Sequence, residues 1–331
     1  MKQPGSIIIS RTDSIGDVIL TLPLATALKQ HFPDAHIAFL GKEYTRPVIE
    51  ACSSVDQFLL LDDFLSGEVL LAGKKPEVII HVFPVASIAS RAKALGIPVR
   101  IGTRSRLFHW LSCNRLISLS RKNSDLHEAQ LNLKLLRGLD LPTVFSRGQA
   151  GTMFSMDRIA SLPGDLAGLF DHSKKAVILH PKSQGSAREW RLDHFIRLIQ
   201  LLDSNRFQIF ISGTAKEEPM LAPLFEAVGD SVTNIAGLMD LATFISFIGN
   251  SDALVANSTG PLHIASALGK MAIGIYPPIR PMHPGRWAPI GPRSQYFVAD
   301  RDCADCRSSP SSCSCMDLVT PVSIASALKN L

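Results

Sequence analysis

Short apolar runs alternate with amphipathic stretches along most of this chain, and this alternation constrains the fold more than any other feature. In the first half, the pattern predicts strands at residues 7–10, 36–40, 58–61 and 78–83 and helices at residues 18–30 and 126–137. In the second half, it predicts strands at residues 176–180, 207–212, 253–256 and 271–276 and helices at residues 192–202, 217–228, 241–248, 262–268 and 322–331. Such alternation is typical of parallel sheets whose crossover helices cover both faces. The sequence therefore predicts an α/β protein with two Rossmann-like domains.

The length of the chain and a change in its composition indicate where one domain ends. A chain of 331 residues is longer than a single hydrophobic core usually organises. Between about residues 141 and 175 the alternation gives way to scattered Gly, Pro and Ser, as in an interdomain linker. We expect an N-terminal domain at residues 1–160, a C-terminal domain at 170–318, and a last helix at 319–331 that could pack back on the N-terminal domain.

Composition and charge narrow the class of protein further. Hydrophobic residues make up 46% of the chain and charged residues 19%, which is typical of a packed globular protein rather than a disordered one. No apolar run approaches the roughly 20 residues that span a bilayer, and the first apolar run meets Arg11 too early for a secretory signal. We expect a cytoplasmic location, and peripheral contact with a membrane is compatible with it. The net charge of +5 suits an anionic partner.

The first predicted strand leads through the sequence RTDSIGD, residues 11–17, directly into a helix. Ligands of parallel α/β sheets bind beyond the carboxyl ends of the strands, where this loop lies. One interpretation is local: Ser14 caps the helix and Asp17 favours the positive end of its dipole. The other makes Asp17 a general base that Arg11 and nearby amides keep ionised. The residues alone leave both interpretations open.

The loop after the first strand of the second half has the composition of a diphosphate site. Its sequence KSQGSAREW, residues 182–190, places Lys182 and Arg188 among small polar residues. Backbone amides could approach phosphate oxygens there while the two cations neutralise their charge. The GxxxxGK[ST] spacing of a P-loop is absent. The alternative is a basic turn that stays solvated.

A second anion site is expected at the loop NSTGPLH, residues 257–263. Pro261 suits the first turn of a helix, so the free amides near Thr259 and Gly260 point out of the helix end. An anion is favoured at that position. The alternative for His263 is a histidine packed in the core.

Basic residues are concentrated in one stretch of the first half. A solvated basic surface is one interpretation, and recognition of an acidic acceptor together with attraction to anionic lipid is the other. Nucleic acid is not expected, because no aromatic interleaving or binding motif accompanies these charges. The stretch comprises Arg91, Lys93, Arg100, Arg104, Arg106, Arg115, Arg121 and Lys122.

Four cysteines follow near the C-terminus with the spacing C-x2-C-x6-C-x-C. They are Cys303, Cys306, Cys313 and Cys315. Four thiolates could hold a structural zinc ion, although C-x-C is a less usual zinc knuckle than C-x2-C. The alternative is free or paired thiols that stabilise a tail loop.

Taken together, the loop sequences resemble glycosyltransferase family 9, the heptosyltransferases of lipopolysaccharide core assembly. The resemblance covers nearly the whole chain in the right order: RTDSIGDVILTLPL at 11–24, HEAQLNLKLL at 127–136, HPKSQGSAREW at 180–190, NSTGPLHIASALG at 257–269 and residues 274–289. It implies a GT-B fold, with an acceptor-binding N-terminal domain and a C-terminal domain that binds the nucleotide sugar. It also implies an ADP-heptose donor and a lipid A–Kdo acceptor at the inner face of the membrane.

The resemblance implies roles for particular residues. Asp17 falls on the family's catalytic base. The expected contacts to the donor diphosphate are Lys182, Ser183, Arg188, Thr259, Gly260 and His263. The expected contacts to the nucleotide are Gly213, Thr214, Glu217, Glu218 and Met239. Those to the donor sugar are Asn257 and Ser258, and those to the acceptor are Arg11, Arg104, Arg106 and His127.

One position departs from the family's pattern, because Ser258 stands where the family usually has an aspartate. A changed contact to a donor hydroxyl can redirect selectivity between sugars. With the resemblance, the expected reaction is inverting. It is expected to be independent of metal, because no DxD-like carboxylate motif lies in a suitable strand-end loop. Two alternatives stay open: transfer from another nucleotide sugar to another cell-envelope glycan, and a non-catalytic nucleotide-sugar-binding homologue. A dehydrogenase is disfavoured, because no GxGxxG follows the first strand.

Overall fold

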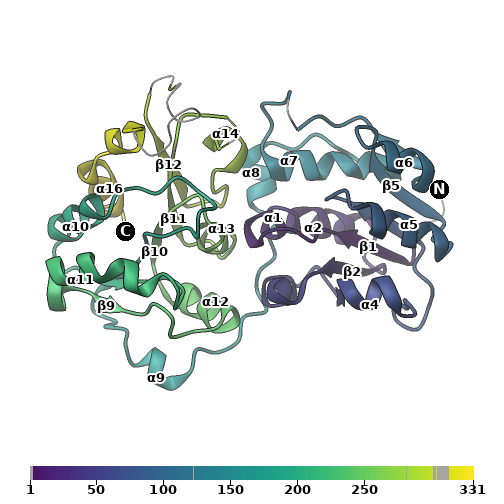
Figure 1. Cartoon of the computed structure of the whole chain (residues 1–331). Coiled ribbons are helices and arrows are strands. Elements are labelled where there is room, and N and C mark those ends of the chain that lie inside the picture. The colour runs from purple at the N-terminus through teal and green to yellow at the C-terminus, as the bar shows by residue number, and fades with distance from the viewer. Residues whose placement is uncertain (1–2, 122, 281, 301–302, 304–312) are drawn as a thin grey trace. The chain divides into compact units, whose positions relative to one another are not determined.

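The computed structural model describes residues 3–121, 123–280, 282–300, 303 and 313–331. The chain divides into two compact units, Met1–Arg158 and Ile159–Leu331. The division lies inside the segment 141–175 that we expect to link the domains. Each unit contains one six-stranded parallel sheet accompanied by helices (Figure 1). The predicted α/β class with two Rossmann-like domains is therefore confirmed.

The N-terminal domain is built on a sheet with the strand order β3-β2-β1-β4-β5-β6. Its strands are β1 (Ser6–Ser10), β2 (His36–Gly41), β3 (Gln57–Leu60), β4 (Val78–His81), β5 (Val99–Thr103) and β6 (Arg115–Ile117). Its α-helices are α1 (Ile15–Ile19), α2 (Leu22–His31), α3 (Arg46–Glu50), α4 (Leu61–Ser66), α5 (Ala86–Ala94), α6 (Leu107–Ser112), α7 (Glu128–Leu133) and α8 (Arg147–Gly151). Two 3-10 helices are η1 (Glu43–Thr45) and η2 (Lys134–Leu139).

The C-terminal domain has a sheet with the order β12-β11-β10-β7-β8-β9. Its strands are β7 (Lys175–His180), β8 (Phe207–Ile211), β9 (Thr233–Asn234), β10 (Ala253–Asn257), β11 (Met271–Tyr276) and β12 (Ser294–Val298). Its α-helices are α9 (Gly164–Ala167), α10 (Leu192–Leu201), α11 (Ala222–Val228), α12 (Leu241–Asn250), α13 (Gly260–Ala267), α14 (Pro284–Trp287) and α16 (Pro321–Leu328). Its 3-10 helices are η3 (Glu218–Leu221), η4 (Gly229–Ser231) and η5 (Cys315–Leu318).

Both sheets have the same topology when their strands are numbered along each domain. In each, the strand order reverses beside the first strand, so β1 lies next to β4 and β7 lies next to β10. This strand order, 3-2-1-4-5-6, is that of the Rossmann fold, and its ligands bind at the reversal point beyond the carboxyl ends of the strands. The loops that follow β1, β4, β7 and β10 are therefore the places where function is expected.

Central strands are buried on both faces, which explains their continuous apolar sequences. All five residues of β1 and all five of β10 are buried. On one face of the C-terminal sheet, helix α10 presents Phe195, Leu198 and Ile199 to a core that also contains Trp190. Their spacing of three and four residues places them on one stripe of the helix.

Three predicted helices are interrupted in the structure. Residues 18–30 form α1 and α2, and Pro23 in the first turn of α2 supplies no amide hydrogen to extend the earlier helix. Residues 126–137 form α7 followed by the 3-10 helix η2. Residues 217–228 begin as η3 before α11.

The last helix, α16, packs against α10, and its Ile324 and Leu328 join the same core cluster. A return of this helix to the N-terminal domain stays a prediction. Across the described residues, no helix is both long and apolar enough to cross a membrane.

Candidate functional site

Arg11 organises the edge of the N-terminal sheet beyond β1. Its amide donates to the carbonyl of Leu40, which fixes the chain at the end of the strand. The guanidinium is only 3% exposed; its Nε lies 2.7 Å from Asp13 Oδ1 and its Nη2 contacts Asp17 Oδ1. Its Nη1 lies 3.1 Å from Glu128 Oε1. One cation thus holds three carboxylates, two from its own loop and one from α7.

Glu128 and Arg121 connect this loop to α7. Glu128 is fully buried and accepts a second hydrogen bond from Arg121, with Nε and Oε1 2.9 Å apart. Arg121 also donates to the carbonyl of Val82, just beyond β4, over 3.1 Å. The side chain of Asn132 accepts from Arg121 over 3.2 Å and donates to the carbonyl of Leu20 over 3.0 Å. The loops after β1 and β4 are therefore joined by one buried polar network.

Asp17 lies in the first turn of α1 with its side chain 18% exposed. Ser14 occupies the N-cap position but makes no capping hydrogen bond with its side chain. Instead, its hydroxyl donates to Asp17 Oδ2 over 2.5 Å, while Arg11 contacts Oδ1. The local interpretation is therefore confirmed for the N-cap position of Ser14 and wrong for its side chain, which bonds Asp17 and makes no capping hydrogen bond. A partly exposed carboxylate held at both oxygens has the arrangement of a positioned base.

Burial and charge oppose one another around Arg11. Burial alone lowers the pKa of Arg11, but Asp17, Asp13 and Glu128 outweigh it and raise the pKa overall. Burial raises the pKa of Asp13; Arg11 opposes this change and Asp17 adds to it. The pKa of Tyr44 is raised by burial and by the same two aspartates, and its hydroxyl donates to the carbonyl of Asp13. The guanidinium therefore keeps its charge at any physiological pH.

The other residues predicted to bind the acceptor have varied positions. His127 is buried and its Nδ1 caps α7 by accepting from the amide of Ala129 over 3.2 Å. Arg106 is the N-cap residue of α6. The guanidinium of Arg104 lies 5.3 Å from the centre of the Trp110 ring. These two arginines stand at the start of α6, whereas His127 lies in the interior.

The basic stretch is only partly a solvated surface. Arg91 donates to the carbonyls of Phe64 and Gly67, and Arg100 donates to those of Ile97 and Ser112. The guanidinium groups of these two arginines therefore hold loops of the domain in place. Arg115 lies 3.5 Å from Asp140, and Lys122 lies outside the described residues.

In the C-terminal domain, the loop after β7 is folded around Glu189. This carboxylate lies 2.7 Å from Lys182 Nζ and accepts from both the amide and the hydroxyl of Ser183 over 2.9 Å. The chain then turns through Gln184 and Gly185, which have φ angles of 49° and 78°. Lys182 is therefore positioned by an ion pair, and the alternative of a solvated basic turn is wrong for this residue. Arg188 is half-buried in the same loop.

Glu217 joins this loop to the one after β8. Its Oε2 accepts from the amide and the hydroxyl of Thr214 over 2.9 Å, and its Oε1 accepts from the amide of Gln184 over 3.0 Å. Nearby, His180 Nδ1 and Ser212 Oγ lie 2.9 Å apart. Burial lowers the pKa of His180 to about 4, although Glu217 and Glu189 oppose the change. The buried carboxylate of Glu217 thus orders both loops.

The loop before α12 closes on the loop after β8. Gly237 has a φ of +71°, and its amide donates to the carbonyl of Gly213 over 3.0 Å. A Cβ atom at Gly237 would lie 3.0 Å from the Cα of Ala215. The half-buried Met239 follows this contact, and the exposed carboxylate of Glu218 accepts from the side chain of Asn234 over 3.1 Å. The residues predicted to bind the nucleotide are therefore brought to one edge of the sheet.

The loop after β10 lies beside the loop after β7. Asn257 is fully buried; it accepts from the amide of Trp190 over 2.8 Å and donates to the carbonyl of Pro181 over 2.9 Å. Thr259 is the N-cap residue of α13, Gly260 begins the helix, and His263 is buried in its first turn. Burial raises the pKa of Tyr276, and a hydrogen bond with Ser258 opposes this change. The donor residues predicted in both loops thus meet at the reversal point of the sheet.

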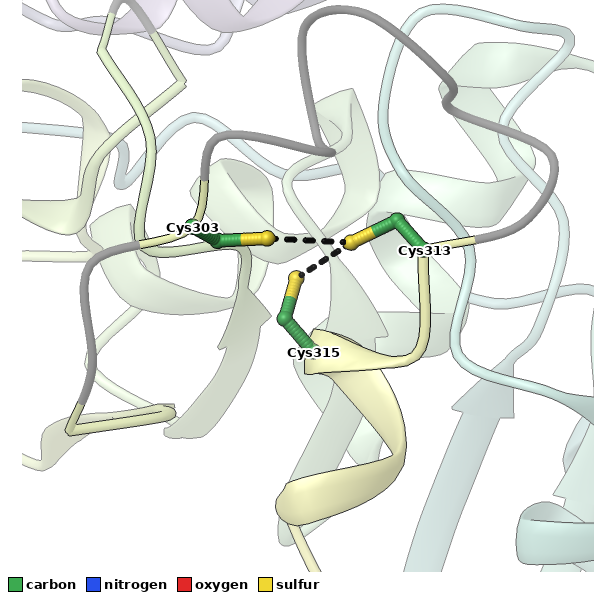
Figure 2. Close-up of side chains that lie close together, drawn as sticks. All are labelled: Cys303, Cys313 and Cys315. Carbon is green, nitrogen blue, oxygen red and sulfur yellow. Dashed lines mark hydrogen bonds between the residues drawn. The ribbon is translucent and has the colours of Figure 1, made fainter.

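Three of the four clustered cysteines are described, and Cys306 lies outside the described residues. Figure 2 shows the sulfur atoms of Cys303, Cys313 and Cys315 pointing toward one another. Cys303 and Cys313 have sulfur atoms 3.4 Å apart, and those of Cys313 and Cys315 are 3.2 Å apart.

Sequence reasoning missed several residues that shape both sites. These are the anionic or amide partners of predicted cations and loops: Asp13, Glu128, Asn132, Glu189 and the buried Trp190. All five lie within the loop motifs that carry the family resemblance. A search for counter-charges near Lys182 could have found Glu189. Glu128 is 117 residues from Arg11, and no local spacing links the two.

Comparison with known proteins identifies the family. The family described as glycosyltransferase family 9 (heptosyltransferase) matches residues 88–317. The chain is 29% identical over 308 residues to lipooligosaccharide heptosyltransferase 2 of Haemophilus influenzae, covering 84% of this chain and 85% of the relative.

Solved structures share the fold at lower sequence identity. The glycosyl transferase family 9 structure from Veillonella parvula has a TM-score of 0.77 and 15% identity, covering 100% of this chain and 98% of that one. The E. coli heptosyltransferase WaaC with ADP has a TM-score of 0.73 and 18% identity, covering 98% and 99%. The two parallel six-stranded sheets match the GT-B fold of these heptosyltransferases. The chain belongs to glycosyltransferase family 9, the heptosyltransferase family.

Proposed function

We propose that the protein is an inverting glycosyltransferase that transfers a heptose-like sugar from an ADP-sugar to a lipopolysaccharide core acceptor of the lipid A–Kdo type. The observation that carries the proposal is the carboxylate of Asp17, held by Arg11 and Ser14 beyond the carboxyl end of β1. Membership of a heptosyltransferase family supports the class of sugar and acceptor.

The donor is assigned to the C-terminal domain. A structural relative was solved with ADP, and the loops after β7, β8 and β10 lie at one edge of the corresponding sheet here. Lys182 and Arg188 would balance the diphosphate, and the amides at Thr259 and Gly260 suit an anion at the start of the eight-residue helix α13. Met239 and the Gly213–Thr214 turn are the proposed contacts to the nucleoside. Of the two acids predicted to contact the nucleotide, Glu218 keeps its carboxylate at the surface, whereas Glu217 is buried.

The proposed reaction is a single displacement. An acceptor hydroxyl loses its proton to Asp17 as its oxygen forms a bond to the anomeric carbon. The bond from that carbon to the diphosphate oxygen breaks on the opposite face, so the configuration inverts and ADP leaves. Lys182, Arg188 and the amides near Thr259 meet the charge that grows on the leaving oxygen, which preorganised donors stabilise by a few kcal/mol each, on the order of 3. The proposed step uses only cations and amides of the chain and requires no metal ion.

The identity of the sugar depends on Ser258. The serine side chain is hydrogen bonded to Tyr276, whose own hydroxyl donates to the carbonyl of Trp287 over 2.6 Å. Serine has a shorter side chain than aspartate and carries no charge, so it would contact a hydroxyl of the donor sugar differently. The presence of Ser258 instead of an aspartate also favours a second candidate function. In that function, a transferase of this fold uses a different nucleotide sugar on another envelope glycan.

The variant Asp17→Asn tests the catalytic role. Asparagine keeps the size of the side chain but cannot take the proton, so turnover is expected to fall about 10²–10⁴-fold while ADP affinity is retained. Release of ADP from ADP-heptose in the presence of a lipid A–Kdo acceptor measures turnover, and calorimetry measures affinity. Asp13→Asn is the matched control, because it removes the other loop carboxylate on Arg11 and should cost far less turnover. Normal turnover by Asp17→Asn would contradict the proposal.

We further propose that the enzyme works at the cytoplasmic face of the inner membrane and docks there through α6. Leu107, Trp110 and Leu111 are 86%, 53% and 77% exposed, although they are apolar. Arg104 and Arg106 stand at the start of the same helix. Exposed leucines beside a tryptophan and cations fit the interface of an anionic bilayer.

Flotation with phosphatidylglycerol vesicles tests this contact. The double variant Leu107→Ser/Leu111→Ser is expected to lose most vesicle binding, because the apolar area that enters the interface is removed. Val144→Ser is the matched control, since Val144 is an isolated apolar side chain that is 91% exposed in the same domain. Equal binding by both variants would exclude α6 as the docking surface.

A further inference from the structure

The sulfur atoms of Cys303, Cys313 and Cys315 converge with a spacing close to that of metal-bound thiolates. All three lie within 4.8 Å of one another, and the two shorter separations are 3.4 and 3.2 Å (Figure 2). A disulfide requires about 2.05 Å. Two thiolates bound tetrahedrally to zinc at about 2.3 Å lie about 3.8 Å apart, so a small expansion would admit the ion.

The three sulfurs come from two separate segments of the chain. Cys303 follows β12, whereas Cys315 begins η5 and Cys313 lies two residues before it. Their convergence therefore depends on the fold and does not follow from the C-x-C spacing alone. Cys303 and Cys315 belong to the buried core cluster of the C-terminal domain, together with Met316 and Val319. An apolar shell that excludes water strengthens thiolate–metal bonds.

The two described cysteines of the N-terminal domain have a different environment. Cys52 and Cys113 are each buried alone, and burial raises the pKa of the Cys52 thiol to about 11. They behave as small apolar core residues. Among the described cysteines, those of the C-terminal domain are clustered and those of the N-terminal domain are not.

We propose that Cys303, Cys313 and Cys315 are ligands of one structural zinc ion that fixes the C-terminal tail to the core of the C-terminal domain. Zinc is favoured because thiolates are its preferred ligands in small structural sites and because it needs no redox partner. The fourth cysteine of the sequence motif, Cys306, lies outside the described residues, and the proposal depends on the other three.

The site would also support the loop after β7. The tail that begins at Cys315 reaches Val319, whose carbonyl accepts from the indole of Trp190 over 2.9 Å. The amide of the same tryptophan donates to Asn257, and Arg191 lies 3.8 Å from Asp317 in η5. Loss of zinc is therefore expected to loosen the loops assigned to the donor. This consequence rests on the proposed function, whereas the metal site does not.

Elemental analysis of the full chain, purified under reducing conditions without chelators, tests the site. We expect about one zinc per chain in the wild type and near zero in Cys313→Ser, because a structural zinc needs its thiolates. Cys52→Ser, at a buried cysteine remote from the cluster in sequence, is the control and should keep the metal. Replacement of zinc by cobalt gives a second readout, since a thiolate-bound cobalt ion has a sulfur charge-transfer band that the variant should lack.

If the variant fails to fold, titration of the wild type with a mercurial reagent tests the site instead. The zinc released should then rise in proportion to the thiols modified. Wild type without stoichiometric zinc, or zinc retained by Cys313→Ser, would overturn the proposal. So would a disulfide between two of the three cysteines that persists after purification under reducing conditions. If wild type binds zinc but no nucleotide, the metal site stands and the proposed function fails.

Discussion

Arg11 is the residue through which the candidate base is connected to the interior of the N-terminal domain. Its guanidinium contacts two carboxylates of its own loop and the fully buried Glu128 of α7. Removing one member of such a network leaves the remaining buried charge without compensation, which costs more than the pair contributed in place. The position of Asp17 is therefore coupled to a carboxylate more than a hundred residues away.

The variant Glu128→Gln tests that coupling. It leaves Arg11 and Arg121 without their shared counter-charge, so the N-terminal domain should lose about 3 kcal/mol of unfolding free energy. Chemical denaturation followed by tryptophan fluorescence measures the change. Glu43→Gln is the control, because it breaks an ion pair with Arg46 on the surface of the same domain and should shift the midpoint little. Equal shifts for the two variants would contradict the network's role.

His81 makes stability depend on pH in the N-terminal domain. It is fully buried at the end of β4, and neither ring nitrogen has a hydrogen-bond partner among the described residues. Burial lowers the pKa of His81 to about 3, and His109 and Arg100 contribute. The unfolded chain takes up a proton near pH 6.5, whereas the folded chain does so only near pH 3. Stability is therefore present above pH 6.5 and lost as the pH falls toward 3.

Replacing His81 by leucine should remove this part of the dependence. Between pH 6 and 4.5 the unfolding free energy of the wild type is expected to fall up to about 1.4 kcal/mol per pH unit more steeply than that of His81→Leu. Some dependence persists in the variant, because burial also lowers the pKa of His180, to about 4. His172→Asn, at an exposed histidine, is the control. Parallel curves for wild type and His81→Leu would show that His81 does not titrate on unfolding.

At the scale of one residue, sequence reasoning identified the candidate base and the cations but missed their partners. Lys182 lies in a short loop after a strand, and Asp17 lies in the first turn of the helix that follows one, so sequence spacing carries information about both. Glu128 occupies the first turn of a predicted helix, where an acidic residue is ordinary, and only the fold brings it to Arg11. The same holds for His81 and Glu217, whose burial depends on neighbouring elements.

At the scale of elements, two loops of the C-terminal domain are packed so closely that one position requires glycine. Gly237 and Gly269 both have a φ of +71°, yet a Cβ at Gly237 would lie 3.0 Å from Ala215 Cα, whereas one at Gly269 meets nothing within 4 Å. Alanine at either position incurs a left-handed backbone cost of about 1 kcal/mol. Only at Gly237 must a neighbouring loop also move.

The pair Gly237→Ala and Gly269→Ala separates these two effects. Thermal stability should fall in both variants, but ADP affinity, measured by calorimetry, should weaken about tenfold or more only in Gly237→Ala. The reason is that the displaced residues 213–215 belong to the proposed nucleoside contact, and about 1.4 kcal/mol of lost contact energy is tenfold in affinity. Unchanged affinity in Gly237→Ala would remove this loop from the binding site.

The elements that sequence patterns predicted are those with strong apolar character. Strands β1, β7 and β11 are continuous apolar runs and were predicted to within one residue. Strands β5, β6, β9 and β12 were missed, because they are short, interrupted by Arg and Gly, or only half-buried at sheet margins. Helix interruptions at residues 20–21 and 134 depend on Pro23 and on tertiary packing, which periodicity does not reveal.

At the scale of the whole molecule, two copies of one topology carry different chemistry. The N-terminal copy places a carboxylate and its supporting guanidinium beyond its first strand, and the C-terminal copy places cations and helix amides beyond the corresponding strand. The strand order of both sheets is the same, although the sequence shows no repeat of residues between the two domains. Under the proposed function, the N-terminal domain supplies the base and the C-terminal domain binds the diphosphate of the donor.

Calorimetric titration of ADP, UDP, GDP and dTDP into wild type, Arg188→Ala and Arg197→Ala tests this account most directly. We expect ADP to bind most tightly to the wild type and about 10–100-fold more weakly to Arg188→Ala, since a charge-assisted contact to phosphate is lost. Arg197→Ala, at an exposed arginine of α10, should bind as the wild type does. Selective binding of another nucleotide, or no nucleotide binding at all, would contradict the assignment of an ADP-sugar donor.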